Sequence, residues 1–327
     1  MQRRDFARSV TVLGFTGLIA AAQQHRRVRR IGALLLMVED DLGRSRLAVF
    51  QRRLDELGWR SGDNISLDVR WAGDDYQRAR GEAAELVRTT PDVLFVLGTG
   101  GVAALLQQTR TIPIVFVQVT DPVAAGFVTS LSAPGGNVTG FANFGASVGG
   151  ERLRLLHEIA PQLHRALIIF EADTPLQPGL FRSTEQVAAS VGVQLTREGV
   201  RDASTLEHDV GEFAREPNSG LVIVQGLFTT KHRERIVALA ARHRLPAVYP
   251  LASFVEIGGL VSYGVNVPGM WQDAAGYINR ILRGATPGTL PVQEPAQPEI
   301  VVNLGTAKNL GLPIPAGLQA RATKVVG

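Results

Sequence analysis

Short runs of apolar, often β-branched residues alternate along this chain with segments that repeat apolar residues at helical spacing. Strands that alternate with helices indicate βαβ units, which build a parallel sheet with helices on both faces. We therefore expect the first half to form a doubly wound α/β domain. Its predicted strands are 31–38, 65–71, 92–97 and 114–119, and its predicted helices are 46–57, 77–87, 102–108 and 123–131.

A segment rich in glycine and proline, 132–144, interrupts this alternation, and a second series of the same kind follows it. The chain is thus predicted to fold as two doubly wound parallel-sheet lobes joined by a hinge at 139–143. A cleft then lies between the carboxyl ends of the strands, where open α/β sheets bind ligands. The predicted strands of the second series are 166–170, 193–198, 220–224 and 247–249, and its predicted helices are 150–159, 183–191, 205–214 and 231–243.

The remaining pattern completes the predicted lobes with a strand at 260–263, a helix at about 269–282 and a closing strand at 299–303. Return crossings between the lobes are expected near 249–252 and 286–291. The predicted first lobe is 31–140 with about 252–288, and the predicted second lobe is 141–251 with about 289–327.

The first 22 residues have the parts of an export signal. Arg3 and Arg4 precede an uncharged apolar stretch, 10–22, and small residues near Ala22 fit a cleavage site. The stretch is too short to span a bilayer as a helix, which takes about 20 residues. Residues 1–22 are therefore predicted to be a signal peptide for the periplasm, by the secretory or the twin-arginine route, and 23–30 a basic tail. A buried first helix is the alternative.

Charge and composition exclude several classes of function. The 327 residues include 34 Lys and Arg against 30 Asp and Glu, but seven arginines lie in the first 30 residues, so the body is nearly neutral and no nucleic-acid partner is expected. The chain has no cysteine, which excludes disulfide scaffolds and thiolate metal sites. No histidine lies in a metal-binding pattern, so neither a metal nor a cofactor is predicted. The basic run 231–235 is predicted to be the solvated start of a helix.

The sharpest local motif is the turn Gly98–Ala103, between a predicted strand and a predicted helix. Glycines there let a ligand approach backbone amides at a helix N-terminus, which favours an anion. Thr99, Gly100 and Gly101 are therefore predicted to hold a carboxylate or carbonyl group. The spacing also matches a dinucleotide turn, with Asp121 placed as the ribose acid. A turn without any ligand is the third possibility.

Polar residues at other predicted strand ends and crossings complete the candidate ligand site. Asp121 is placed to accept a hydrogen bond from a ligand ammonium or hydroxyl group, or to cap the next helix. Asn143, in the crossing segment, is placed to bond to ligand or to brace the hinge. The other predicted ligand contacts are Asp173, Gln225, Tyr263 and Asn266, for which loop polarity or, for Tyr263, core packing is the alternative. No catalytic residue is predicted.

The chain carries an ordered set of short motifs: 111–116 (TIPIVF), 121–123 (DPV), 126–128 (GFV), 134–141 (PGGNVTGF), 262–264 (SYG), 281–285 (ILRGA), 290–292 (LPV), 302–304 (VNL), 306–307 (TA) and 310–312 (LGL). This set resembles the ABC-transporter substrate-binding proteins of the type I periplasmic-binding-protein fold, in the subgroup linked to tryptophan-type transporters. Relatives that bind aromatic amino acids tend to carry aspartates where this chain has Asn143 and Asn266, which leaves fewer acids to hold an ammonium group.

The resemblance implies a monomeric periplasmic receptor that performs no chemical step. It captures a small organic solute, such as a carboxylate, an amide or an aromatic amino-acid-like molecule, by hinge closure, and delivers it to an inner-membrane ABC permease. The alternative is an exported NAD(P)-dependent oxidoreductase that uses Gly98–Ala103 as its dinucleotide turn. A third possibility, the sensory core of a regulator, is disfavoured by export and by the lack of a helix-turn-helix before the first lobe.

Overall fold

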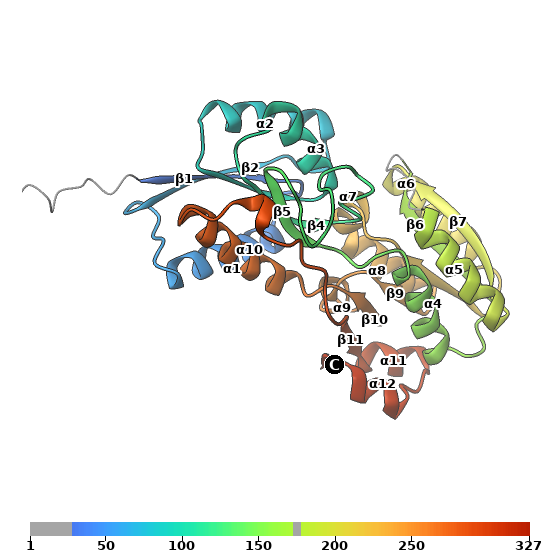
Figure 1. Cartoon of the computed structure of the whole chain (residues 1–327). Coiled ribbons are helices and arrows are strands. Elements are labelled where there is room, and N and C mark those ends of the chain that lie inside the picture. Colours follow the sequence, from blue (N-terminus) through green and yellow to red (C-terminus); the bar gives the residue numbers. More distant parts are fainter. Residues whose placement is uncertain (1–27, 173–177) are drawn as a thin grey trace, which may run out of the picture.

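The structure is a computed structural model that describes residues 28–172 and 178–327. Within these residues the strands form two sheets, of five and seven strands, each in its own lobe (Figure 1). The two-lobed α/β fold expected from the hydrophobic pattern is therefore confirmed. The predicted signal peptide and most of the basic tail lie outside the described residues, as does Asp173.

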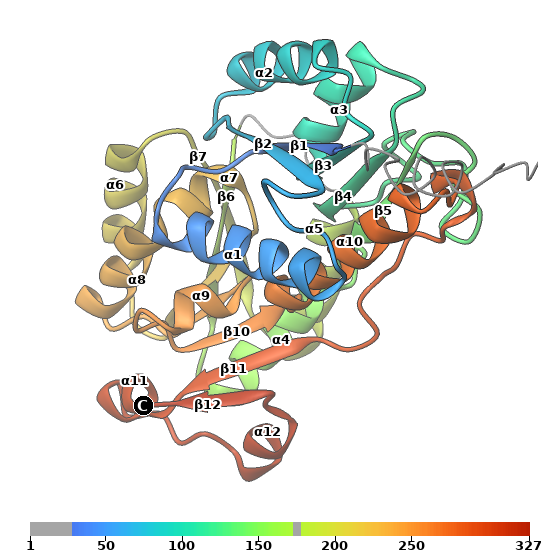
Figure 2. The same ribbon diagram turned by 90° about the vertical axis from the view of Figure 1, so that its left-hand side faces the viewer.

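The first lobe is built on a fully parallel sheet in the order β2-β1-β3-β4-β5. Helices α2 and α3 cover one face, and α1 and α10 cover the other (Figure 2). The strands are β1 (Arg29–Leu35), β2 (Ile65–Trp71), β3 (Val93–Leu97), β4 (Ile114–Val119) and β5 (Val138–Ala142), and the helices are α1 (Asp41–Glu56), α2 (Tyr76–Arg88), α3 (Thr99–Gln108) and α10 (Val267–Leu282), with a 3-10 turn, η1, at Pro287–Thr289.

The second lobe has a sheet in the order β12-β11-β10-β9-β8-β6-β7, in which only the β10–β11 pair is antiparallel. Its strands are β6 (Arg165–Glu171), β7 (Gln194–Val200), β8 (Ser219–Ile223), β9 (Ala247–Tyr249), β10 (Val261–Gly264), β11 (Glu299–Asn303) and β12 (Lys324–Val326). Its helices are α4 (Val148–Ile159), α5 (Pro178–Val191), α6 (Ala203–Phe213), α7 (Leu227–Lys231), α8 (Arg233–Arg242), α9 (Ala252–Val255), α11 (Leu304–Leu310) and α12 (Ala316–Arg321).

The chain crosses between the lobes after β5, after β10 and between Gln293 and β11. These crossings differ from the predicted ones, because β10 pairs with β9 and β11 and so places 252–264 in the second lobe. Residue Gln293 still pairs with Phe141 of the first lobe. Hydrophobic periodicity reports which segments are strands but not which sheet a strand joins, so the sequence pattern alone misplaced these boundaries.

Two predicted helices also differ from the structure. The stretch 123–131 forms a turn instead of a helix: the amide of Gly126 donates to the Val123 carbonyl, and Gly126 itself has φ +71°, outside the helical region. The predicted helix 231–243 is divided into α7 and α8 at His232, whose φ and ψ of −96° and 20° leave the regular helix.

Gly264, at the second crossing, allows an unusually close approach of two backbone segments. A Cβ atom added there would lie 1.8 Å from the carbonyl oxygen of Pro250, which only a backbone shift relieves. Overpacking of this kind costs about 1–3 kcal/mol. Gly264→Ala is therefore expected to lower the melting temperature by about 2–12 °C, measured by differential scanning calorimetry.

The matched control is Gly276→Ala in the middle of α10. A Cβ atom there meets nothing within 4 Å, and alanine is the better helix former. The melting temperature of this variant is expected to stay the same or rise. Equal losses in the two variants would contradict the close approach at Gly264.

Candidate functional site

A cavity of about 150 Å³ lies between the lobes, at the carboxyl ends of both sets of parallel strands. The first lobe contributes the loops after β1, β2, β3 and β4, and the second contributes the ends of β6 and β8 with parts of α4, α5, α7 and α8. The carboxyl ends of the parallel strands of both lobes thus meet at one site, as the α/β pattern predicts. A cavity of this volume is large enough for one small ring such as benzene.

Four of the predicted ligand contacts line this cavity: Thr99, Gly100, Asn143 and Gln225. Thr99 and Gly100 form the first turn of α3, which Gly98 introduces with a φ of +85°. The ring of Tyr76 lies directly over Gly100, because a Cβ atom there would be 2.3 Å from the Tyr76 Cε1 atom. The glycine is therefore required for the aromatic wall of the cavity.

Two further predicted contacts are placed elsewhere in the first lobe. Gly101 packs α3 onto the sheet, since a Cβ atom there would meet the side chains of Val96 and Leu36 at 2.5 and 2.9 Å. Asp121 uses its Oδ1 atom to accept from the Ala124 amide at 3.0 Å, which closes the turn that stands where the predicted helix was expected. Neither residue lines the cavity.

Tyr263 and Asn266 are also outside the cavity lining. The Tyr263 ring packs against that of Phe144, with centroids 6.1 Å apart. Asn266 caps α10, because its Oδ1 atom accepts from the Gly269 amide at 2.9 Å. Asp173 lies outside the described residues, so its predicted role stays a prediction.

Two ion pairs that the sequence analysis missed join the lobes beside the cavity. Lys231 Nζ lies 2.9 Å from Asp74 Oδ2, and Arg233 lies 3.0 Å from Asp40 Oδ2. The prediction of a solvated helix start at 231–235 is therefore wrong for the Arg233 side chain, which is 13% exposed, whereas the Lys231 side chain pairs across the cleft and is still 39% exposed. Asp40 and Asp74 both follow strands at the carboxyl edge, which was the available signal, but their partners come from the other lobe and no local pattern marks them.

Two arginines lining the cavity are almost fully buried. Arg46 of α1 is 6% exposed and Arg152 of α4 is 4% exposed. Burial lowers the pKa of each guanidinium to about 10, and for Arg46 the nearby charge of Arg233 adds to the effect. Both side chains stay cationic at neutral pH. The sequence analysis did not identify either arginine, because it assigned their helices, α1 and α4, from the spacing of apolar residues alone.

Two buried carboxamide oxygens in the cavity lining have no hydrogen-bond partner within the described residues. They are Gln118 Oε1 and Asn143 Oδ1. Gln118 has φ +57° at a β-bulge in β4, between Val117 and Val119, and bulges of this kind redirect side chains next to sites. A buried acceptor without a donor costs about 1–3 kcal/mol, so both oxygens are suited to a bound donor.

Tyr76 and Glu171 face each other across the cavity from the two lobes. Burial and the nearby charge of Glu171 together raise the pKa of Tyr76 to about 12, so the phenol stays protonated and able to donate. The Leu227 amide donates to Glu171 Oε2 at 3.0 Å, which fixes the carboxylate at the end of β6. The site thus combines one aromatic wall with groups of both charges.

Metal and membrane chemistry find no support in the described part of the chain. Within 28–172 and 178–327, no group of three or more histidine, aspartate or glutamate side chains is arranged to hold a metal ion. Across the same residues, no helix is both long enough and apolar enough to cross a membrane.

Two doubly wound lobes with three crossings and a cavity between them define the type I periplasmic-binding-protein fold. The family model described as ABC transporter substrate binding protein matches residues 33–326, and the chain belongs to this family. The chain is therefore a binding protein and not an enzyme, which overturns the oxidoreductase alternative.

Individual relatives share this architecture over most of their length. A tyrosine-binding protein of Clostridioides difficile (strain R20291) is 24% identical over 293 residues, which are 88% of this chain and 82% of the relative. A conserved domain protein from Vibrio cholerae is 27% identical with a TM-score of 0.81, over 91% of this chain and 100% of the other. The structure of an ABC domain in complex with L-Trp from Streptococcus pneumoniae is 20% identical with a TM-score of 0.81, over 91% and 99%.

Proposed function

We propose that this protein is the periplasmic receptor of an ABC importer, which captures one small organic solute between its lobes and delivers it to an inner-membrane permease. The observation that carries this proposal is the interlobe cavity, whose lining holds unpaired buried polar atoms and comes from both lobes. Its volume fits a solute with a single ring. The ligands named for two similar proteins, tyrosine and L-Trp, support a solute of the carboxylate, amide or aromatic amino-acid-like classes.

Within this proposal, ligand contacts come from the residues that line the cavity. Thr99 and the amide of Gly100 hold a carbonyl or carboxylate oxygen at the start of α3, where the helix dipole favours negative charge. Asn143 and Gln118 accept from a donor group of the solute. Gln225, at the end of β8, closes the cavity from the second lobe.

Hinge closure is the proposed binding step. The three crossings, at 142–145, 264–267 and 293–299, connect the two lobes, and closure bends the backbone in these segments. A solute that touches both lobes favours the closed arrangement by its differential affinity for it. The two cross-lobe ion pairs support closure, because each requires the lobes to be within about 3 Å of each other at that point.

A thermal-shift screen tests the proposed function. Amino acids, aromatic acids, amides, sugars and NAD(P) are each added to the mature chain, and a ligand present at 100 times its Kd is expected to add about 2.7 kcal/mol of stability. We expect one small-solute class to raise the melting temperature and NAD(P) to leave it unchanged. A protein that responds to NAD(P) alone would not be a solute receptor.

The Asp74–Lys231 ion pair is expected to contribute modestly to ligand affinity through closure. Both side chains are over one-third exposed, and pairs of that kind contribute about 0.2–1 kcal/mol. Asp74→Asn and Lys231→Met are each expected to weaken binding up to about 5-fold, and the double variant no more than either single one. Isothermal titration calorimetry of the four proteins measures this coupling.

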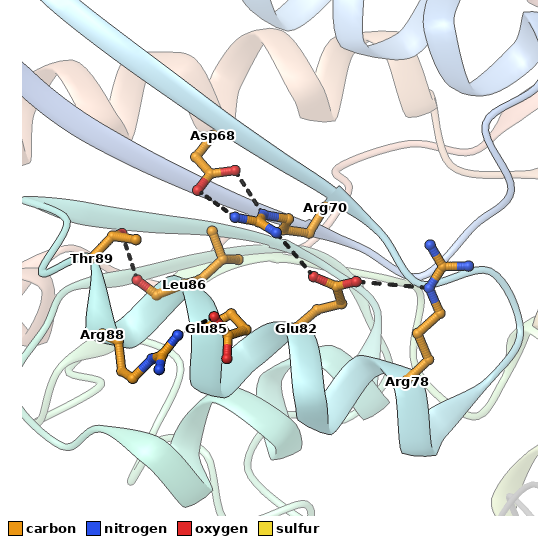
Figure 3. Close-up of polar contacts among 8 residues, drawn as sticks. All are labelled: Asp68, Arg70, Arg78, Glu82, Glu85, Leu86, Arg88 and Thr89. Carbon is orange, nitrogen blue, oxygen red and sulfur yellow. Dashed lines mark hydrogen bonds and ion pairs between the residues drawn. The ribbon is translucent and has the colours of Figure 1, made fainter.

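The matched control is Glu82→Gln in an ion-pair network confined to the first lobe (Figure 3). Glu82 lies 3.4 Å from Arg70 and 3.8 Å from Arg78, and all three belong to β2 and α2. This variant is expected to bind ligand as tightly as the unmodified chain. Additive effects at Asp74 and Lys231 would show that the pair does not act in closure.

The same ion pair gives a pH dependence. Burial by itself raises the pKa of Asp74, but the hydrogen bond and charge of Lys231 outweigh it and leave the pKa below its ordinary value. A carboxyl group whose pKa is lowered by folding contributes its full stabilisation above the unfolded pKa, and this stabilisation is lost as the pH falls through the folded pKa. The affinity difference between the parent and Asp74→Asn is therefore expected to hold at neutral pH and to shrink only below about pH 4.

A further inference from the structure

We propose that the solute is a monocarboxylate of net charge −1 without an ammonium group, and that Arg152 binds its carboxylate. This inference rests on the proposed receptor function and names the chemistry of its ligand. Three features of the described cavity lining carry it: an uncompensated buried cation in the second lobe, acidic side chains that are all engaged, and neutral acceptors at the ends of β4 and β5 in the first lobe.

Arg152 is the uncompensated cation. Its Nε atom donates to the Tyr263 carbonyl at 3.0 Å, and its two terminal nitrogens find no hydrogen-bond acceptor within the described residues. No carboxylate of those residues lies within ion-pair distance of it, although the side chain is 4% exposed and lines the cavity. A buried charge without a partner is costly, and a planar guanidinium matches a carboxylate with two parallel hydrogen bonds.

The other cations of the lining already have acidic neighbours. Lys231 and Arg233 pair with aspartates across the cleft at 2.9 and 3.0 Å. Arg46 lies within the electrostatic reach of both Asp40 and Glu256. Among the residues that the structure describes, Arg152 has no comparable acidic neighbour, so it is the cation that a ligand anion completes.

The charge count of the lining favours an anion over a zwitterion. Its described residues include four basic side chains, Arg46, Arg152, Lys231 and Arg233, and three acidic ones, Asp40, Asp74 and Glu171. A monoanion brings the net charge of +1 on these described residues to zero, whereas a zwitterion leaves it unchanged. Among the same residues an ammonium group also finds no disengaged acid, because Asp40 and Asp74 are paired and Glu171 accepts from the Leu227 amide.

The side of the lining that comes from β4 and the end of β5 suits a neutral donor. The free oxygens of Gln118 and Asn143 accept from a hydroxyl or an amide N–H without needing a positive charge. Tyr76 and Phe144 add apolar ring surface to the same cavity. A phenolic or amide-bearing aromatic carboxylate satisfies all of these groups together.

Three probes that share one ring separate the possibilities by isothermal titration calorimetry at pH 7. They are 3-(4-hydroxyphenyl)propionate, L-tyrosine, which adds the ammonium group, and tyramine, which keeps the ammonium and lacks the carboxylate. We expect the propionate to bind at least about 10-fold more tightly than L-tyrosine and tyramine not to bind. Tighter binding of L-tyrosine or tyramine overturns the inference and leaves the receptor function intact.

The variant Arg152→Gln tests the anchor directly. It is expected to weaken binding of the propionate about 10–150-fold, because it removes a charged hydrogen-bond donor, while the ligand-free protein melts no lower than the parent. Arg154→Gln, an exposed position on the same helix that pairs with Glu151, is the control and is expected to bind normally. Undiminished binding by Arg152→Gln overturns the inference, and if that variant does not fold, the ranking of the three probes decides.

The same titrations distinguish this inference from the proposed function. Binding of a neutral or zwitterionic solute with a decrease in the radius of gyration, measured by small-angle scattering, supports the receptor function and overturns the inference that the ligand is a monocarboxylate. A scattering profile unchanged by every solute that raises the melting temperature overturns closure and the inference that rests on it.

Discussion

Trp271→Ala is expected to lower the free energy of unfolding by about 3–5 kcal/mol, as removal of a large buried aromatic side chain does. Trp271 is 0% exposed on α10, and its ring lies 5.0 Å from that of Phe95 and 6.5 Å from that of Phe50, in edge-on contacts. These three rings join α10, α1 and the first sheet. The chain returns from the second lobe through α10, which packs with α1 on one face of the first sheet (Figure 2). Loss of the Trp271 ring is therefore expected to loosen the packing of that face.

The expected fall in melting temperature is about 6–20 °C, measured by calorimetry with chemical denaturation as a second probe. Trp271→Phe is the control. The Trp271 Nε1 atom is buried and has no partner among the described residues, so phenylalanine removes an unsatisfied donor while it keeps an aromatic ring. We expect this variant to lose less than about half as much stability. Equal losses would mean that ring packing does not hold α10 in place.

Gln118→Met is expected to change stability and affinity in opposite directions. Methionine keeps the length of the side chain and removes the buried oxygen that has no partner in the described residues. The ligand-free protein is expected to gain about 1 kcal/mol or more, because a desolvated acceptor is no longer buried. Ligand affinity is expected to fall about 5–150-fold, because the acceptor for the solute is lost. Thermal melts and calorimetric titrations measure the two effects separately.

Ser262→Ala is the matched control for these opposite effects on stability and affinity. The Ser262 Oγ atom is equally buried and without a partner within the described residues, but it lies on β10 outside the cavity lining. Its removal is expected to leave affinity unchanged and stability the same or higher. A loss of affinity at Ser262, or none at Gln118, would contradict the placement of the ligand against β4.

Local sequence patterns were sufficient to predict the two doubly wound lobes and the turn before α3. Alternating apolar runs report strands and helices, and the glycines of 98–101 mark a close backbone approach. The pattern could not separate glycines that face a ligand from those that pack a helix, so Gly100 lines the cavity whereas Gly101 packs against Val96. That distinction depends on which neighbour lies over each Cα atom.

The missed site residues share one property: their roles depend on contacts between distant segments. Arg233 pairs with Asp40, 193 positions away, and Arg152 of α4 donates to the Tyr263 carbonyl of β10, 111 positions away. The polar residues Asp121 and Asn266 looked equally suited to a ligand, but each is used by the amide three residues later. Short-range capping thus competes with ligand binding for the same residue types, and the sequence does not report which prevails.

Ligand-driven closure is tested most directly by a distance between the two lobes. The natural chain has no cysteine, so Arg80→Cys on α2 and His208→Cys on α6, both exposed, give one spin-label pair. Pulsed electron–electron double resonance is then recorded with and without a solute that raises the melting temperature. Binding by closure predicts a longer and broader distance distribution without ligand and one short, narrow distance with it. An identical distribution in both states would contradict binding by closure of the lobes.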